Sequence, residues 1–426
     1  MYKERTVVKL ESLFWAIVVL AFLFQEAIVK FFEPITYMDE ALALAFFIYY
    51  LMTMFRRRIS KTDMFILGVI FLLCVLGFAG NGHTRLQDDL QYQLRDAFNI
   101  FKFVMILLGA FRFFDNYTTK RYLIHYVAVA LKLLISVGFV FMLLNFVADI
   151  GMHTDIRHGM RTYQFIFVRV GSLYSSCMLW LVILTAEQYC NRPKYNAIFI
   201  WMTLAIMIST LRSRALAFVV VYVVIYYLLL INKGKKQWWL YGAITAAALL
   251  FIGKNQFEFY FSGDTSARSV LLRYGIVVAR SYFPLGAGFA TYGTAVARDT
   301  NAKLYQIFGF NQYWGLGKSG RSGFLTDNYW PAIMGEFGFI GMGLMVVLLA
   351  LVIIKLLKAT DNPYSKVCIL FVMGSLLLAS IATSSFLACT PHMMLLALVC
   401  KLNYPDQKNT LRENEYGAFN RFYPNL

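Results

Sequence analysis

Apolar segments separated by short polar connections recur along this chain and limit its fold more than any other feature. A helix rises about 1.5 Å per residue, so roughly 20 apolar residues cross a hydrocarbon core of about 30 Å. The predicted fold class is therefore an all-α polytopic membrane protein with about twelve transmembrane helices. The predicted spans are residues 12–32, 39–55, 63–79, 97–113, 122–148, 169–188, 196–211, 215–231, 237–253, 329–354, 366–386 and 388–402.

The composition supports this class and excludes others. Hydrophobic residues make up 59% of the 426 residues, charged residues make up 15%, and the mean hydropathy is +0.60. These values are typical of a helical membrane protein rather than a soluble enzyme. The formal net charge of +17 would suggest nucleic-acid binding in a soluble chain, but most lysines and arginines lie in short clusters between apolar segments. We therefore expect a lipid bilayer around the chain and no nucleic-acid partner.

The cysteines and histidines do not form ligand patterns. The six cysteines lie within or at the ends of apolar segments without a CxxC pair, and the five histidines show no HExxH spacing. We predict no disulfide framework, no metal site and no cofactor.

The basic clusters predict how the chain is threaded through the membrane. They occupy every second connection, and cytoplasmic loops are the ones enriched in lysine and arginine. Both termini are therefore predicted to be cytoplasmic. The external connections are then residues 33–38, 80–96, 149–168, the turn at Arg212 and Arg214, residues 254–328 and a short turn near Cys389.

This threading divides the chain into four parts. Residues 1–253 would hold spans one to nine, residues 254–328 a long external loop with amphipathic helices, residues 329–402 spans ten to twelve, and residues 403–426 a cytoplasmic tail.

One apolar run, residues 196–231, is interrupted only by Ser209-Thr210-Leu211-Arg212-Ser213-Arg214. Its 36 residues are too many for one span and barely enough for two, so we predict a tight helical hairpin. Its turn would hold two guanidiniums at the membrane surface, and the planar guanidinium fork suits phosphate oxygens. A pair of snorkelling interfacial arginines is the alternative. The predicted outward position opposes the usual charge bias and favours the anion-binding interpretation.

The long external loop carries eight basic and four acidic residues. Its sequence Asp264-Thr265-Ser266 resembles a helix N-cap, and Pro284 ends the periodic run, which predicts a helix over Ala267–Phe283. At 100° per residue, Arg273 and Arg280 share one side, while Val270, Leu271, Tyr274, Val277 and Val278 share another. Either the arginines face a polar cavity, or the helix is a surface amphipathic helix with solvated arginines.

A glycine-rich stretch, residues 284–293, follows this helix. Its spacing does not match a nucleotide-binding loop and no strand precedes it, so we expect its glycines to permit a tight turn and close backbone approach. Further along, Tyr313 and Trp314 offer flat apolar faces on which sugar rings could rest, although interfacial aromatic belts look the same. The loop closes on Asp327-Asn328, and Glu336 lies at the start of the next span.

The order of these features resembles the O-antigen polymerase and O-antigen ligase superfamily of bacterial inner-membrane glycosyltransferases. The resemblance covers residues 209–357. It rests on Ser213-Arg214 at an outer hairpin turn, an arginine-bearing helix running into Pro-Leu-Gly-Ala-Gly-Phe-Ala-Thr-Tyr-Gly, and Asp-Asn-Tyr followed by Gly-Glu-Phe-Gly-Phe-Ile-Gly. Ligases of the family carry a histidine before the amide where this chain has Asp327, so the resemblance favours a polymerase.

The resemblance implies a C-type membrane glycosyltransferase fold in the bacterial inner membrane with an active site facing the periplasm. The implied reaction joins undecaprenyl-pyrophosphate-linked oligosaccharide units into O-antigen or a related surface polysaccharide, without a metal and with inversion at the anomeric carbon. A chain-length regulator and a flippase of the same pathway are implied partners.

The expected site residues fall into three groups. Catalytic candidates are Asp327 as first acceptor of the hydroxyl proton, Glu336 as second, and Arg214. The expected pyrophosphate ligands are Arg212, Arg214, Arg268, Arg273 and Arg280, and the expected glycan contacts are Asn328, Tyr313 and Trp314.

Two other functions remain open on the sequence. The first is an O-antigen ligase that transfers polysaccharide to lipid A core, and the second is a transporter or flippase of lipid-linked oligosaccharide. Against a transporter, we find no internal repeat between the halves, a feature of many transporter folds. A purely structural membrane scaffold would leave the outward arginines unexplained.

Overall fold

The computed structural model describes residues 2–29, 31–56, 58–157, 159–232, 266–317, 320 and 322–402. These residues are almost entirely helical, and their only sheet is the two-residue hairpin β1 (Ile156–Arg157) and β2 (Met160–Arg161). The longer helices are α1 (Tyr2–Leu23), α3 (Met38–Met54), α4 (Lys61–Thr84), α5 (Leu90–Phe113), α6 (Tyr117–Val147), α7 (Val170–Cys190), α8 (Asn196–Ser209), α9 (Ser213–Tyr226), α11 (Ala267–Ser281), α14 (Tyr329–Lys358), α15 (Pro363–Ser380) and α16 (Thr390–Cys400). The short ones are α2 (Gln25–Ile28), η1 (Glu33–Tyr37), η2 (Tyr227–Ile231), α12 (Ala295–Asp299), α13 (Lys303–Ile307), η3 (Phe310–Gln312) and η4 (Ser385–Leu387).

Seven helices of the described residues are long and apolar enough to cross a bilayer. They are Glu33–Met54, Lys61–Thr84, Tyr117–Val147, Val170–Cys190, Ser213–Ile231, Tyr329–Lys358 and Pro363–Ser380. Two shorter apolar helices, Asn196–Ser209 and Thr390–Cys400, accompany them. The chain is therefore a helical protein suited to a lipid bilayer. The count of twelve spans stays a prediction, and the span predicted at 237–253 lies outside the described residues.

Local sequence explains where several helices begin. Ser60 accepts a hydrogen bond from the backbone N–H of Asp63 at the start of α4, and Asn116 accepts one from Thr118 at the start of α6. Asn362 caps α15 in the same way, with Pro363 at the first helical position. Such side chains satisfy backbone donors that a helix start leaves free.

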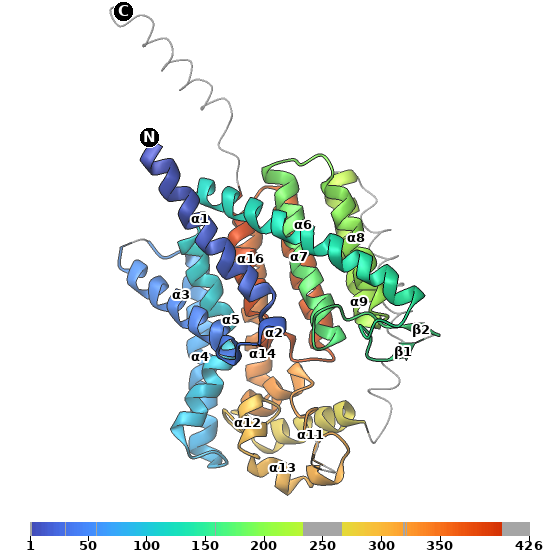
Figure 1. The fold of residues 1–426 in the computed structure, drawn as a ribbon. Helices are drawn as coiled ribbons and strands as arrows, with labels where there is room; N and C mark the ends of the chain where they lie inside the picture. The colour runs from blue at the N-terminus through green and yellow to red at the C-terminus, as the bar shows by residue number, and fades with distance from the viewer. Residues whose placement is uncertain are drawn as a thin grey trace, which may run out of the picture.

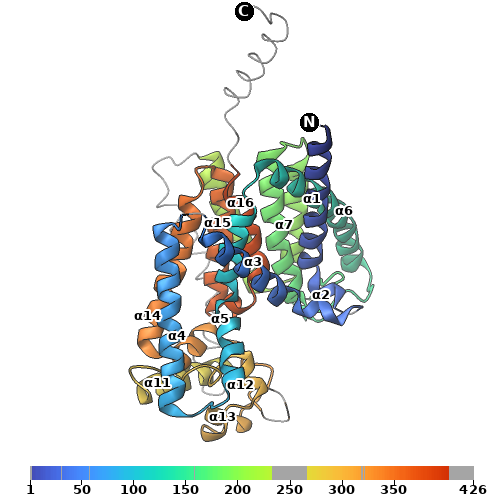
Figure 2. The same cartoon turned by 90° about the vertical axis from the view of Figure 1, so that its left-hand side faces the viewer.

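Two of the connections that are predicted to lie outside, residues 80–96 and 254–328, meet at one end of the bundle, the lower end in Figure 1. The hydroxyl of Thr84 donates to the carbonyl of Ala287 (2.9 Å), and Lys303 Nζ donates to the carbonyl of Arg85 (2.9 Å). The small helices α11, α12 and α13 also lie at this end in both views (Figures 1 and 2).

Connections that are predicted to lie inside meet at the opposite end. Arg121 Nε donates to Asn191 Oδ1 (2.9 Å), and Lys401 Nζ donates to Asp115 Oδ1 (2.9 Å). The N-terminus of α1 lies at this end in Figure 1. The grouping agrees with the predicted alternation of connections, while the assignment of either end to the cytoplasm stays a prediction.

Labelling of two engineered cysteines tests this arrangement. Five native cysteines are buried and Cys74 is half-buried, so a cysteine-free variant is a suitable background. Gln306→Cys places a thiol on exposed α13, and Asp361→Cys places one on the exposed connection between α14 and α15. In spheroplasts, we expect an impermeant maleimide to label Gln306→Cys directly and Asp361→Cys only after lysis. Labelling of both, or the reverse order, would contradict the arrangement.

Candidate functional site

The helical hairpin predicted for residues 196–231 is present as α8 and α9 joined through Thr210–Arg212. α8 has only 14 residues, fewer than the roughly 20 that cross a hydrocarbon core, so the turn can shift little relative to the membrane. Leu211 adopts a left-handed backbone with φ of 51°, which costs a non-glycine residue about 1–2 kcal/mol. The backbone N–H of Tyr163 donates to the carbonyl of Ser209 (3.1 Å), which fastens the loop after α6 to this turn.

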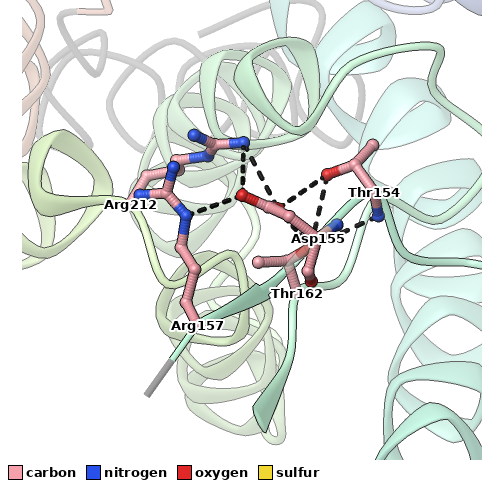
Figure 3. Close-up of polar contacts among 5 residues, drawn as sticks. All are labelled: Thr154, Asp155, Arg157, Thr162 and Arg212. Carbon is pink, nitrogen blue, oxygen red and sulfur yellow. Dashed lines mark hydrogen bonds and ion pairs between the residues drawn. The ribbon is translucent and has the colours of Figure 1, made fainter. Parts of the chain in front are cut away.

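This loop and the hairpin turn together form what we call the arginine cluster (Figure 3). Asp155 and Arg157 come from the loop, and Arg212 comes from the turn. Arg157 Nε donates to Asp155 Oδ2 at 2.8 Å. One terminal nitrogen of Arg212 lies 3.4 Å from each carboxylate oxygen of Asp155. The three side chains are each about one-third exposed, at 36%, 34% and 33%, so the cluster is open to solvent at its edge.

Hydrogen bonds from its own loop hold Asp155 in place. The hydroxyls of Thr154 and Thr162 each donate to Asp155 Oδ1 at 2.9 Å. Partial burial alone would raise the pKa of Asp155, but the hydrogen bonds from Arg157, Thr154 and Thr162 and the charge of Arg212 outweigh it and lower the pKa to about 2. Asp155 is therefore an anion at every physiological pH.

The arginine cluster can bind an anion. Its two guanidiniums and one carboxylate carry a net charge of +1, and the contacts to Asp155 use only one nitrogen of each guanidinium. Half-buried Arg214 is the second residue of α9 and has no hydrogen-bond or ion-pair partner among the described residues. Guanidinium nitrogens left over in this way suit bidentate contacts to phosphate oxygens.

A second charged pair lies at the same end of the bundle. Arg268, at the start of α11, is 7% exposed and donates to Asp327 Oδ2 at 2.6 Å. Asp327 immediately precedes Asn328, the N-cap residue of α14, so the pair joins the long loop to the helix that follows. Asn328 is buried, and its Nδ2 has no hydrogen-bond partner among the described residues.

The helix predicted at Ala267–Phe283 is α11, which begins at Ala267 as predicted, with Ser266 as its N-cap, and ends at Ser281. Arg273 and Arg280 are both exposed and share one side, as predicted, but buried Arg268 is not on that side. On the predicted apolar side, Val270, Leu271 and Val278 are buried, while Val277 is 41% exposed.

The glycine-rich stretch packs tightly between α4, α5 and α14. The side chain of Asn81 both accepts from the backbone N–H of Phe289 (2.8 Å) and donates to its carbonyl (3.0 Å). A Cβ atom on Gly288 would come within 2.4 Å of the backbone nitrogen of Asn81, and φ at Gly288 is 94°. The predicted role of these glycines in tight turns and close backbone approach is therefore confirmed.

Glu336 lies beneath this stretch. It is fully buried, and its Oε1 accepts from the backbone N–H groups of Thr291 (3.3 Å) and Tyr292 (3.4 Å) and from Thr294 Oγ1 (3.2 Å). Asp96 of α5 binds the same stretch, because its Oδ2 accepts from the backbone N–H of Ala290 (2.8 Å). Glu336 thus holds the loop and, in this conformation, is shielded from any external substrate.

The predicted glycan contacts are separated by environment. Trp314 is 54% exposed and its ring lies 5.3 Å from that of Phe324, while Tyr313 is half-buried. Of these two predicted aromatic contacts, Trp314 is the one that presents a broad face at the surface.

The structure brings together some predicted residues and separates others. Arg212 and Arg214 share the hairpin turn, and Arg268 joins Asp327, but no hydrogen bond or ion pair among the described residues links these two groups. Sequence reasoning did not select Asp155, Arg157 or Asp96. Nothing in the order of residues indicates that the loop with Asp155 and Arg157 folds back onto the hairpin turn.

Comparisons with known proteins assign this chain to no family. No protein-family model matches the chain, and no curated protein matches it. Among the described residues, no group of three or more His, Cys, Asp or Glu side chains is placed to hold a metal ion. What the fold and site define is thus a helical membrane protein with an anion-suited arginine cluster at one end.

A pair of glycine substitutions tests the packing beneath the site. In Gly288→Ala, a left-handed backbone costs an L-residue about 1–2 kcal/mol and overpacking about 1–3 kcal/mol, so the midpoint of thermal unfolding in detergent should fall. Gly82→Ala is the matched control, because its Cβ meets nothing within 4 Å and alanine is the better helix former. An unchanged midpoint in Gly288→Ala would refute the close-approach role.

Proposed function

We propose that this chain is a bacterial inner-membrane glycosyltransferase that polymerises oligosaccharide units carried on polyprenyl pyrophosphate. The observation that carries the proposal is the arginine cluster. Two helices and a folded-back loop converge there at one end of an apolar helical bundle, where a lipid-linked anion would present its headgroup. The resemblance of residues 209–357 to the O-antigen polymerase and ligase superfamily gives the reaction class.

The arginine cluster would stabilise the leaving group. When a hydroxyl oxygen of the acceptor sugar attacks the anomeric carbon, the bond from that carbon to the pyrophosphate oxygen breaks and the pyrophosphate takes the electron pair. Arg157 is held by Asp155 before the reaction, and it would act with Arg212 and Arg214 to stabilise the charge that develops on the leaving oxygen. Charge-assisted hydrogen bonds contribute about 1.5–3 kcal/mol each.

Asp327 is our candidate for the acceptor of the hydroxyl proton. Its Oδ2 is held by Arg268, while its Oδ1 accepts no hydrogen bond from a described residue, and its side chain is 26% exposed. Asn328, beside it in sequence, has an amide donor without a partner among the described residues, and this buried side chain would have to become accessible to contact a sugar hydroxyl. Arg268 thus has a positioning role for Asp327 in this proposal, and Glu336 positions the loop above α14.

The proposal includes a location and partners. The end with the arginine cluster would face the periplasm and both termini the cytoplasm, within twelve spans of the C-type glycosyltransferase kind. The aspartate at position 327 favours polymerase over ligase. The chain-length regulator and the flippase of the pathway would work beside it.

Substitution of Arg212 tests the leaving-group role. We expect Arg212→Ala to abolish polymer and Arg212→Lys to leave little, because lysine keeps the charge but loses the fork. The measurement is glycan gel analysis of cells with equal protein levels. Lys358→Ala, an exposed cation at the opposite end of the bundle, is the matched control and should make normal polymer. Normal polymer in Arg212→Ala would refute the role.

Substitution of Asp327 tests the mechanism. Asp327→Asn keeps shape and removes basicity, so substrate should bind while turnover falls by about 10²–10⁴-fold, the usual contribution of a general base. The assay uses detergent-solubilised protein, lipid-linked repeat units and a chelator, so no membrane has to be crossed.

Three outcomes of this assay are distinct. Elongation that persists in chelator and drops in Asp327→Asn supports metal-independent transfer with an acidic participant. Undiminished elongation in the variant removes Asp327 from the mechanism. A wild-type protein that never elongates the glycan returns the transporter function to first place.

A further inference from the structure

Consecutive backbone N–H groups of the glycine-rich stretch converge on two carboxyls. Ala290 donates to Asp96 Oδ2 (2.8 Å), and the next two residues, Thr291 and Tyr292, donate to Glu336 Oε1 at 3.3 and 3.4 Å. Ala290 has a φ of 58°, and successive N–H groups around a left-handed residue form a concave site for anions. Consecutive residues lie about 3.8 Å apart, so this concave site holds the two carboxyls side by side.

Each of the two carboxyls has one oxygen without a partner. The side chains of Asp96 and Glu336 are 1% and 0% exposed. Neither Asp96 Oδ1 nor Glu336 Oε2 has a hydrogen-bond partner among the described residues. Buried polar atoms in native proteins nearly always have a partner. Two unpartnered oxygens at one place therefore point to a ligand that both carboxyls bind.

The basic side chains nearest to the pair contact other acids. Arg95 of α5 and Arg298 of α12 lie 3.9 and 2.8 Å from the carboxylate of Asp299. Lys303 of α13 lies 3.4 Å from the carboxylate of Asp88. These cations are thus engaged with acids at the surface rather than with the buried pair.

The other titratable groups around the pair also face elsewhere. Tyr305 of α13 accepts at its hydroxyl from the N–H of Gly293 (2.7 Å), and the hydroxyl of Tyr292 donates to the carbonyl of Leu271 (2.7 Å). His83 of α4 is exposed, and Arg268 of α11 contacts Asp327. Among the described residues, no lysine, arginine or histidine forms an ion pair with Asp96 or Glu336. Two ionised carboxylates here would repel each other and lack any counterion.

A proton fits this site better than a metal ion does. Calcium and magnesium ions take about six or more oxygen ligands, whereas the pair offers two unpartnered oxygens. The nearby hydroxyl of Thr294 is already used, since it donates to Glu336 Oε1 and accepts from the N–H of Ala297. A proton needs only one oxygen to carry it and one to accept it.

We propose that Asp96 and Glu336 bind one proton between them and that this proton makes the closure of the glycine-rich stretch sensitive to pH. One carboxyl stays ionised, and the other donates its O–H to the unpartnered oxygen of the first. When the stretch leaves the pair, both carboxyls meet water and the proton passes to solvent, because a carboxyl in water is ionised at neutral pH. Glu336 lies on the helix that begins just after Asp327, so opening would also disturb the candidate site.

The proton balance gives the sign of the pH dependence. The closed stretch holds one proton more than the open stretch, so opening becomes tenfold more favourable with each unit rise in pH while the closed state keeps its proton. Opening lets the amides of residues 286–293 exchange with deuterated water. We expect their protection factors, each taken relative to the intrinsic exchange rate at the same pH, to fall about tenfold per unit between about pH 6 and pH 8.

Hydrogen–deuterium exchange of the purified full-length chain, read by mass spectrometry, tests the proposal. Glu336→Gln and Asp96→Asn each keep the shape of the side chain and supply an N–H donor that does not titrate. We expect either variant to keep the stretch protected and to abolish the pH dependence. Glu187→Gln is the matched control, because Glu187 is equally buried but both of its oxygens have partners, His125 (2.9 Å) and Asn191 (2.5 Å). It should retain the tenfold change.

Several results would overturn the proposal. Protection in the wild-type chain that does not change with pH would mean that no proton is held, and a hundredfold fall per unit would mean that two are held. A tenfold fall that persists in Glu336→Gln or in Asp96→Asn would assign the proton to another group. Replacement of potassium by sodium in the buffer should change nothing, and a sodium-dependent rise in protection would assign the site to a metal ion. The wild-type measurement requires no substitution, so misfolding of one variant leaves the test decisive.

Discussion

A charged side chain that leaves water must find a partner of opposite charge, and ion pairs of this kind hold the described helices together. Lys102 of α5 contacts Asp39 (2.6 Å) and Glu40 (2.9 Å) at the start of α3, and Lys355 of α14 pairs with Asp63 of α4. Removing one partner of such a pair would leave an uncompensated charge, at a cost of about 3–5 kcal/mol. These pairs fix which helices are neighbours, since apolar side chains alone would accept many arrangements.

Close contact between backbones also fixes which segments are neighbours, at the end of the bundle that carries the site. Gly286 approaches the backbone of Glu336, Phe337 and Gly338, and Gly338 breaks the regular backbone of α14 with φ of 68°. The break lets the first turns of α14 face the glycine-rich stretch while the rest of the helix runs through the bundle. The carboxyls of Asp96 and Glu336 then collect the backbone N–H groups of the stretch. The position of Asp327, eleven residues before Gly338, thus depends on packing contacts that take no part in the proposed reaction.

The sequence predicted the helical class, the hairpin at residues 196–231 and the start of α11, because helix length, apolar runs and N-caps are local properties. It also predicted that the glycines permit close approach, since glycine is needed wherever backbones nearly touch. It could not predict that Asp155 and Arg157 join Arg212, which lies 57 residues after Asp155. The loop reaches the turn through the backbone of Tyr163, and a backbone contact leaves no signature in residue order. The pairing of Lys102 with Asp39 was hidden because the two residues lie 63 positions apart and nothing in their order shows that α3 packs against α5.

Asp155 bears on how the arginine cluster would accept an anion. A carboxylate beside two guanidiniums could be a counterion that a phosphate displaces, or a fixed support that aligns them. Displacement would break the two hydroxyl contacts at 2.9 Å as well as the bond to Arg157, and the low pKa of about 2 prevents release by protonation at physiological pH. Arg212, at 3.4 Å, is the looser contact. The geometry therefore favours a fixed Asp155 and Arg157, with Arg212 as the arm that moves onto the anion.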